Sequence, residues 1–185
     1  VVDLQPFSSS ATATVNYTVQ AGDTTSDLTN GTIALGSGAT LVDAGGTAMS
    51  SFTLTGNSLG TNKALVLDTT APTITSITSD LANGSYKAGQ VIDLDITFSE
   101  VVTLAGSDGL EITLTMDGDD RIVDLQPFSS SATATVNYTV QAGDTTSDLT
   151  NGTIALGSNA TLVDAGGTAM SSFTLTGNSL GANKA

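Results

Sequence analysis

The stretch Val-Ile-Asp-Leu-Asp-Ile-Thr-Phe at residues 91–98 alternates strictly between apolar and polar side chains. In an extended chain the apolar members share one face and the polar members share the other. The apolar face holds Ile92, Leu94, Ile96 and Phe98, and the polar face holds Asp93, Asp95 and Thr97. A period of two is typical of an antiparallel strand that is buried on one face and solvated on the other.

The same period recurs on the C-terminal side of this stretch. Residues 110–116 (Leu-Glu-Ile-Thr-Leu-Thr-Met) and residues 132–140 (Ala-Thr-Ala-Thr-Val-Asn-Tyr-Thr-Val) alternate likewise. Shorter strands are expected at 73–78, 122–126, 153–156, 161–163 and 172–176. Clusters of turn-forming residues lie between these segments, and no window of useful length has a helical period. Many short strands separated by frequent turns predict an all-β fold, an antiparallel β-sandwich.

The chain also repeats itself. Residues 2–64 recur as residues 123–185, an offset of 121 positions, with two differences: Gly38 against Asn159 and Thr61 against Ala182. A fixed long period indicates a tandem array of domain-sized units. A catalyst needs one good site, whereas a spacer needs length, so the repetition favours a structural role.

The segment Leu67-Asp68-Thr69-Thr70-Ala71-Pro72 has the character of a boundary, because Pro72 suits the start of an edge strand after a linker. We therefore expect residues 1–64 to be the C-terminal half of a preceding repeat, residues 65–70 to be a linker, and residues 71–185 to be a complete repeat. A half-sandwich leaves a strand edge uncovered. Either a neighbouring chain or the front half of the same chain could complete residues 1–64.

Composition excludes several classes of function. Eighteen acidic residues stand against four basic ones, for a formal charge of −14, so the chain is not expected to bind nucleic acid or anionic membranes. No apolar run is long enough to span a bilayer, so we expect no membrane insertion of this fragment. The sequence has no Cys and no His, and its serines therefore have no histidine to activate them. We expect no enzymatic activity and no catalytic residues.

Four motifs in order resemble the bacterial Ig-like tandem repeats of giant cell-surface adhesins, of the RTX type found in biofilms. They are Tyr86–Gln90, Phe98–Glu100, Tyr138–Asp144 and Asp164–Thr168. Gln90 stands where the family usually has Asp, and Gly167-Thr168 replaces its usual Gly-Asn. The resemblance implies Ig-like antiparallel β-sandwich repeats in tandem, in an extracellular protein of the bacterial cell surface. It also implies Ca²⁺ at the domain junctions, where the ion stiffens the array.

In an Ig-type sandwich the entering linker lies beside the loops after the second strand and before the last one. That arrangement would gather Asp68 in the linker, Glu100 and Asp108 in the loop after Phe98, and Asp164 in the Val-Asp-Ala-Gly-Gly turn. The preceding unit would add Asp23 and Asp27 from its Ala-Gly-Asp-Thr-Thr-Ser-Asp loop. Oxygen ligands of this kind suit Ca²⁺. The alternative is that these are solvated turn residues, since Asp is common in turns for local reasons.

Other acidic residues have simpler interpretations. Asp117-Gly118-Asp119-Asp120 lacks the downstream Glu of a calcium loop and is expected to form a hairpin turn. Asp93 and Asp95 are expected to discourage association at a sheet edge. Tyr138 could hydrogen-bond across the sandwich in the manner of a tyrosine corner.

The sequence therefore predicts a structural extender or spacer repeat of a bacterial cell-surface adhesin or extracellular filament. Its partners would be neighbouring identical repeats or chains. The alternative is an Ig-like module that itself binds a carbohydrate or a protein ligand.

Overall fold

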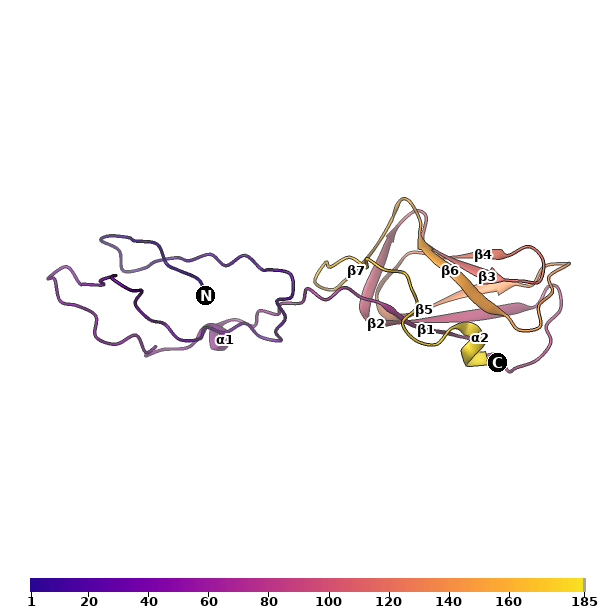
Figure 1. Ribbon diagram of the computed structural model, residues 1–185, viewed down its shortest axis with the longest axis horizontal. Coiled ribbons are helices and arrows are strands. Elements are labelled where there is room, and N and C mark those ends of the chain that lie inside the picture. Colours follow the sequence, from indigo (N-terminus) through magenta and orange to yellow (C-terminus); the bar gives the residue numbers. More distant parts are fainter. Residues whose placement is uncertain (185) are drawn as a thin grey trace. The chain divides into compact units, whose positions relative to one another are not determined.

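The computed structural model describes residues 1–184 and divides the chain into two compact units, Val1–Thr69 and a second unit that begins at Thr70 (Figure 1). The second unit contains all seven strands. They are β1 (Ile74–Thr78), β2 (Val91–Gly106), β3 (Leu110–Thr115), β4 (Arg121–Leu125), β5 (Phe128–Thr139), β6 (Thr150–Leu156) and β7 (Ala160–Asp164). The short helix α2 (Leu180–Lys184) follows them, and the only helix of the first unit is α1 (Leu59–Asn62).

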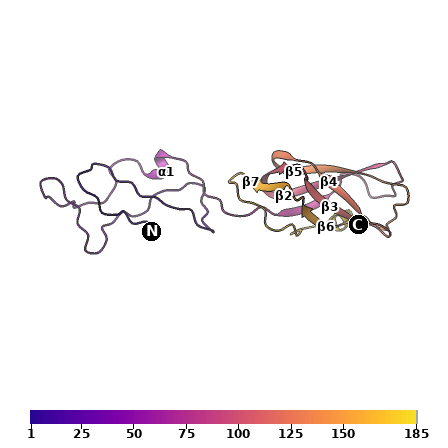
Figure 2. The same cartoon turned by 90° about the horizontal axis from the view of Figure 1, so that it is seen from above.

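The seven strands form two antiparallel sheets. One sheet has the order β1-β2-β5, with β7 also paired to β2, and the other has the order β4-β3-β6. Figure 1 and Figure 2 show the two sheets as the layers of a sandwich. The fold class expected from the alternating segments, an all-β antiparallel sandwich, is confirmed for this unit.

The core lies between the sheets and consists of the apolar faces that the alternation predicts. Leu94 and Ile96 of β2 and Ile112 and Leu114 of β3 have no exposed surface. Burying a side chain of this size contributes about 1.5–3 kcal/mol, so this interior is the main source of the unit's stability.

Strand β2 is longer than the sequence predicts. It continues past Phe98 to Gly106, because it pairs first with β5 and then, beyond an irregularity between Thr97 and Val102, with β7. Val102 and Leu104 are almost fully buried, so the alternation persists through the second part. The expectation of a loop after Phe98 is therefore wrong, and Glu100 lies in a strand.

The expected strand at residues 172–176 is also wrong. This segment lies beside β1 but does not form a regular ladder with it. The N–H of Thr176 donates to the carbonyl of Ile74 at 2.9 Å, and the N–H of Ile77 donates to the carbonyl of Asn178 at 3.1 Å. The expected hairpin at residues 117–120 is confirmed, since β3 and β4 pair on either side of it.

Residues 2–63 of the first unit have almost the same sequence as residues 123–184, but no strand lies within residues 1–69. Its β-type contacts are two isolated bridges, Thr25–Leu67 and Val42–Ala48. Tyr17 is 45% exposed and Met49 is 48% exposed, whereas their copies in the second unit, Tyr138 and Met170, are 4% and 5% exposed. The second copy is buried because β2 and β3, both from residues 70–122, pair with its strands and cover it.

Local turns are the same in both copies. The N–H of Gln20 donates to Asp23 Oδ2 at 2.6 Å, and the N–H of Gln141 donates to Asp144 Oδ2 at the same distance. Asn30 Oδ1 accepts from the N–H of Leu59 at 2.8 Å, and its copy, Asn151 Oδ1, accepts from the N–H of Leu180 at 2.9 Å. Turns and caps therefore depend on the local sequence, whereas the strands require pairing with residues 70–122.

We predict that a second copy of residues 70–121, joined directly before Val1, orders residues 2–64 into strands. Hydrogen exchange with mass spectrometry can follow each copy, because peptides 32–44 and 153–165 differ at Gly38 and Asn159. In the unextended chain peptide 32–44 should exchange quickly. The extension should slow it by roughly a hundredfold or more, to the rate of peptide 153–165.

The matched control carries Leu94→Asp and Ile96→Asp in the added copy, which removes the apolar face of its β2. Peptide 32–44 should then stay unprotected while peptide 153–165 stays protected. Slow exchange of peptide 32–44 in the unextended chain would contradict this explanation, because it would show that the first copy is ordered without a front segment.

Candidate metal centre

Asp164 ends β7 and is fixed in place by the turn that follows. Its N–H donates to the carbonyl of Thr168 at 3.0 Å, and its own carbonyl accepts from Gly167 at 3.2 Å. Gly167 has a φ of +87°, in the left-handed region that glycine adopts without strain. The N–H of Thr168 also donates to Asp164 Oδ1 at 2.7 Å. The backbone of the turn thus determines where the carboxylate points.

The Asp164 side chain occupies a core-facing position and is only 5% exposed. Along β7 it follows Leu162, which is 1% exposed and shares the same face. The second oxygen, Oδ2, is buried and accepts no hydrogen bond within residues 1–184. Burying a carboxylate oxygen without a donor costs free energy, so a positively charged partner at this position would stabilise the fold.

Glu100 is the second carboxylate on the inward side of the sheet. It lies on β2 between Phe98 and Val102, which are 3% and 1% exposed, at a position where the alternation would place an apolar residue. Val102 is the register partner of Asp164, which brings the end of β7 beside the part of β2 that holds Glu100.

Asp68 lies in the segment that leads into β1. That segment runs beside β2, because Thr73 donates to Ser99 Oγ at 3.0 Å and Ser99 donates to the carbonyl of Thr73 at 2.9 Å. Asp68, Glu100 and Asp164 each offer one carboxylate oxygen, and these three oxygens lie within 4.8 Å of one another. Three carboxylates at this separation repel one another, and a hard cation with oxygen ligands would neutralise them.

Asp108 does not join this group. It lies in the turn between β2 and β3, where its Oδ2 accepts from Ser158 Oγ at 3.0 Å and from the backbone and side-chain nitrogens of Asn159, both at 2.9 Å. The hydrogen bond from Ser107, followed by those from Asn159 and Ser158, holds the pKa of Asp108 below its usual value. This carboxylate joins two turns of the sandwich.

Asp23 and Asp27 are engaged within the first unit. Asp23 Oδ2 accepts from the Tyr17 hydroxyl and from the N–H of Gln20, and Asp27 Oδ1 accepts from the N–H of Leu65 at 3.3 Å. In the complete sandwich the copy of Asp23, Asp144, is paired with an arginine. The position of Asp23 therefore serves a structural contact in a finished repeat.

A second acidic group, Asp80, Asp93 and Asp95, also has carboxylate oxygens within 4.8 Å of one another. Here Asp93 and Asp95 have hydrogen-bond donors: Ser79 Oγ and the N–H of Asp80 donate to Asp93 at 2.8 and 3.1 Å, and Thr135 Oγ1 donates to Asp95 at 2.6 Å. The expected role of Asp93 and Asp95 at a sheet edge is wrong, since β2 is flanked there by β1 and β5.

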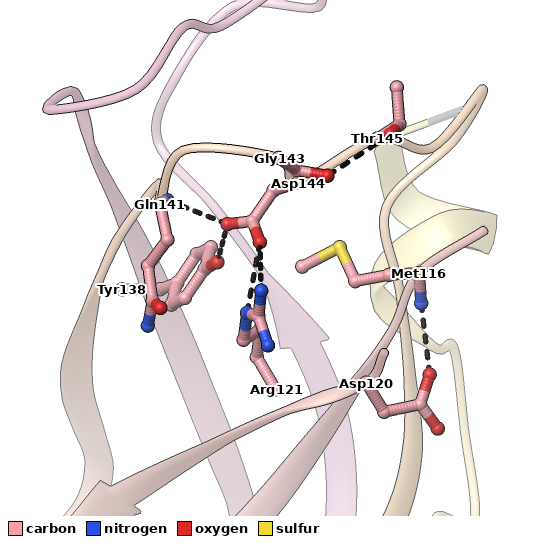
Figure 3. A network of polar contacts seen from close by, with 8 residues as sticks. All are labelled: Met116, Asp120, Arg121, Tyr138, Gln141, Gly143, Asp144 and Thr145. Atoms are coloured by element: carbon pink, nitrogen blue, oxygen red, sulfur yellow. Dashed lines mark hydrogen bonds and ion pairs between the residues drawn. The ribbon is translucent and has the colours of Figure 1, made fainter. Parts of the chain in front are cut away.

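A polar network at the other end of the sandwich centres on Asp144 (Figure 3). Its Oδ1 accepts from Arg121 Nε at 2.9 Å and forms an ion pair with the same guanidinium at 2.7 Å, while its Oδ2 accepts from the Tyr138 hydroxyl and from the N–H of Gln141. Only 4% of the Asp144 side chain is exposed. Tyr138 does hydrogen-bond at a corner, but to a carboxylate six residues downstream.

The network shifts the pKa of two groups. The hydrogen bond from Tyr138 is the main cause that lowers the pKa of Asp144, and the N–H of Gln141 and the Arg121 guanidinium lower it further. Burial, with the Asp144 bond, raises the pKa of Tyr138. The sequence carried one signal for this ion pair, since Arg121 is the only arginine of the chain and lies at the start of β4.

No protein-family model matches the chain, and no curated protein or solved structure matches it either. Over residues 1–184 the structure contains no helix with the length and apolar character needed to cross a bilayer.

The depressed pKa of Asp144 predicts acid sensitivity of the second unit. Since the folded pKa lies below the ordinary value of 3.8, the ionised network stabilises the fold above about pH 4 and is lost as the pH falls through the folded pKa. Asp144→Asn should lower the free energy of unfolding at pH 7 and flatten its decline between about pH 4 and pH 2. Denaturant titrations at several pH values measure both effects.

The matched control is Asp23→Asn, which changes the same residue in the copy that lacks an arginine partner and strands. It should leave both the stability of the second unit and its pH dependence unchanged. Equal acid sensitivity of Asp144→Asn and the unaltered chain would contradict a stabilising role for the network.

Proposed function

We propose that the chain is a structural extender: Ig-like sandwich units in tandem that provide reach in an extracellular adhesin or filament of the bacterial cell surface. Calcium bound where the connecting segment enters a sandwich would stiffen the array. The buried, unpartnered Oδ2 of Asp164 carries this proposal, because it lies in a group with Asp68 of the connecting segment and Glu100 of β2.

The chemistry of these three residues fits Ca²⁺ better than other common metals. All three are carboxylates, whereas zinc and copper sites in proteins usually include imidazole or thiolate ligands, and this chain has no His and no Cys. Ca²⁺ accepts six to eight oxygens in irregular arrangements, so backbone carbonyls and water can complete a set of three carboxylates. A cation held jointly by Asp68 and two sandwich residues would restrict rotation about the connecting segment.

The repetition and the composition support the extender role. Two copies differ at only two positions in residues 2–64 and 123–185, which favours a protein that uses the unit many times. A charge of −14 makes neighbouring units repel unless cations intervene. The absence of His and Cys also leaves the chain without the usual activators of a nucleophile.

We predict that Ca²⁺ raises the stability of the second unit. Extracellular calcium modules bind with dissociation constants of about 10⁻⁴–10⁻³ M, so 10 mM Ca²⁺ should add about 1.4–2.7 kcal/mol. Asp164→Asn should abolish this gain. In chelator the variant should melt no lower than the unaltered chain, because it removes a buried negative charge whose Oδ2 accepts no hydrogen bond within residues 1–184, and it keeps Oδ1 as the acceptor for Thr168.

Asp43→Asn is the matched control, since Asp43 is the copy of Asp164 and accepts the same bond from the N–H of Thr47, at 2.8 Å. It should keep the full calcium response. Calorimetric titration of the unaltered chain should show binding, and Mg²⁺ at equal concentration should stabilise less. A melting temperature that is the same in Ca²⁺ and in chelator would refute the cation site.

A further inference from the structure

The second unit has an open cavity of about 570 Å³ at the end of the sandwich that holds Asp144. This volume lies within the range typical of ligand pockets, about 300–1,000 Å³. Its apolar wall includes Tyr86, Met116, Leu149 and Leu180, and its rim follows the turn of residues 144–149. The first unit contains a copy of this turn, residues 23–28, and shows what binds there.

In the first unit an extended segment, residues 65–69 (Leu-Val-Leu-Asp-Thr), lies along the copied turn. Thr25 and Leu67 exchange two backbone hydrogen bonds of 2.9 Å, and the N–H of Leu28 donates to the carbonyl of Leu65 at 2.7 Å. Thr69 Oγ1 accepts from the N–H of Gly22 at 2.9 Å and donates to the carbonyl of Asp23 at 3.2 Å. These contacts fix the segment in one register.

The same backbone groups are present in the second unit without such a segment. Thr146 is the copy of Thr25 and Leu149 is the copy of Leu28. Across the described chain, the backbone N–H and C=O of Thr146 and the N–H of Leu149 form no hydrogen bond. The side-chain contact within the turn is retained, since Thr146 Oγ1 donates to the carbonyl of Asp148 at 2.8 Å, as Thr25 Oγ1 does to Asp27 at 3.0 Å.

We propose that this cavity is the docking site for an extended segment with the sequence of residues 65–69. The occupant is a second copy of that segment joined after residue 185, the position that corresponds to residue 64 before Leu65. Leu65 and Leu67 share one face of an extended chain, so both side chains can enter the apolar cavity while the backbone pairs with Thr146. Helix α2 starts at Leu180, which lines the cavity, so the segment would begin beside its site.

The second unit should bind this segment more strongly than the first unit does. In the first unit Leu65 is 41% exposed, because residues 1–69 contain no counterpart of the wall that β3 and the loop before β2 supply. In the second unit Tyr86 and Met116 provide that wall. The docked segment would therefore close the core of the sandwich and form an eighth strand. The proposal goes beyond the extender role and requires no cation.

The test extends the full chain after residue 185 with Leu-Val-Leu-Asp-Thr-Thr and is carried out in chelator. Amide exchange measured by NMR should slow at least about tenfold at Leu149, and the melting temperature of the second unit should rise by about 4 °C or more. One control replaces the extension with Gly-Ser residues of equal length. The other replaces both leucines with Asp, which keeps the backbone and removes the apolar side chains. Neither control should slow exchange at Leu149.

The exchange rate of the Leu149 amide distinguishes the possible outcomes. If it is as fast with the leucine extension as with the Gly-Ser extension, the docking site does not exist. If it slows equally with the Asp-containing extension, the cavity plays no part and the proposal is wrong. If it is already slow in the unextended chain and becomes slower with protein concentration, the occupant is residues 65–69 of another molecule, and the proposed covalent continuation is wrong.

Discussion

The pairing of residues 70–122 with residues 123–184 is the interaction on which the fold depends. Strand β2 pairs with β5 and β7, and β3 pairs with β6, so the front half supplies a partner to nearly every strand of the rear half. The first unit shows the same rear-half sequence without such a partner. Ile33 is 46% exposed there, and its copy Ile154 is 8% exposed. One sequence thus has two states, and a long-range partner determines which of them forms.

Local interactions persist in both states and position the acidic residues. The turn after Asp43 has the same hydrogen bond from Thr47 as the turn after Asp164 has from Thr168. Only the second copy becomes part of an acidic group, because Glu100 belongs to the front half and has no copy in residues 1–69. The proposed cation site therefore requires a finished sandwich. This couples cation binding to folding, as expected when ligands come from different elements.

Much of the fold could be predicted from the sequence, because period-two alternation survives wherever one face is buried. It predicted β1, β3 and the first part of β2 to within one or two residues. It missed the second part of β2, since an irregularity near Glu100 places an acid at an inward position and interrupts the apolar pattern. It also assigned a strand to residues 172–176, whose apolar residues pack beside β1 without a ladder. The sequence predicts Asp68, Glu100 and Asp164 as part of a larger set that also includes Asp108, Asp23 and Asp27, and the structure groups only the first three. Asp108 could not be separated from them, because its bonds to Ser158 and Asn159 depend on tertiary contacts.

We propose that cations at the entrance of each sandwich convert a flexible series of units into a stiff spacer. The most direct measurement is small-angle X-ray scattering from a chain of four tandem copies of residues 65–185, in Ca²⁺ and in chelator. With strands of about ten residues at 3.3–3.4 Å per residue, each unit should add roughly 35–45 Å to the maximum dimension in Ca²⁺. We expect a long, rod-like particle in Ca²⁺ and a smaller radius of gyration in chelator. Superimposable scattering profiles under the two conditions would contradict it.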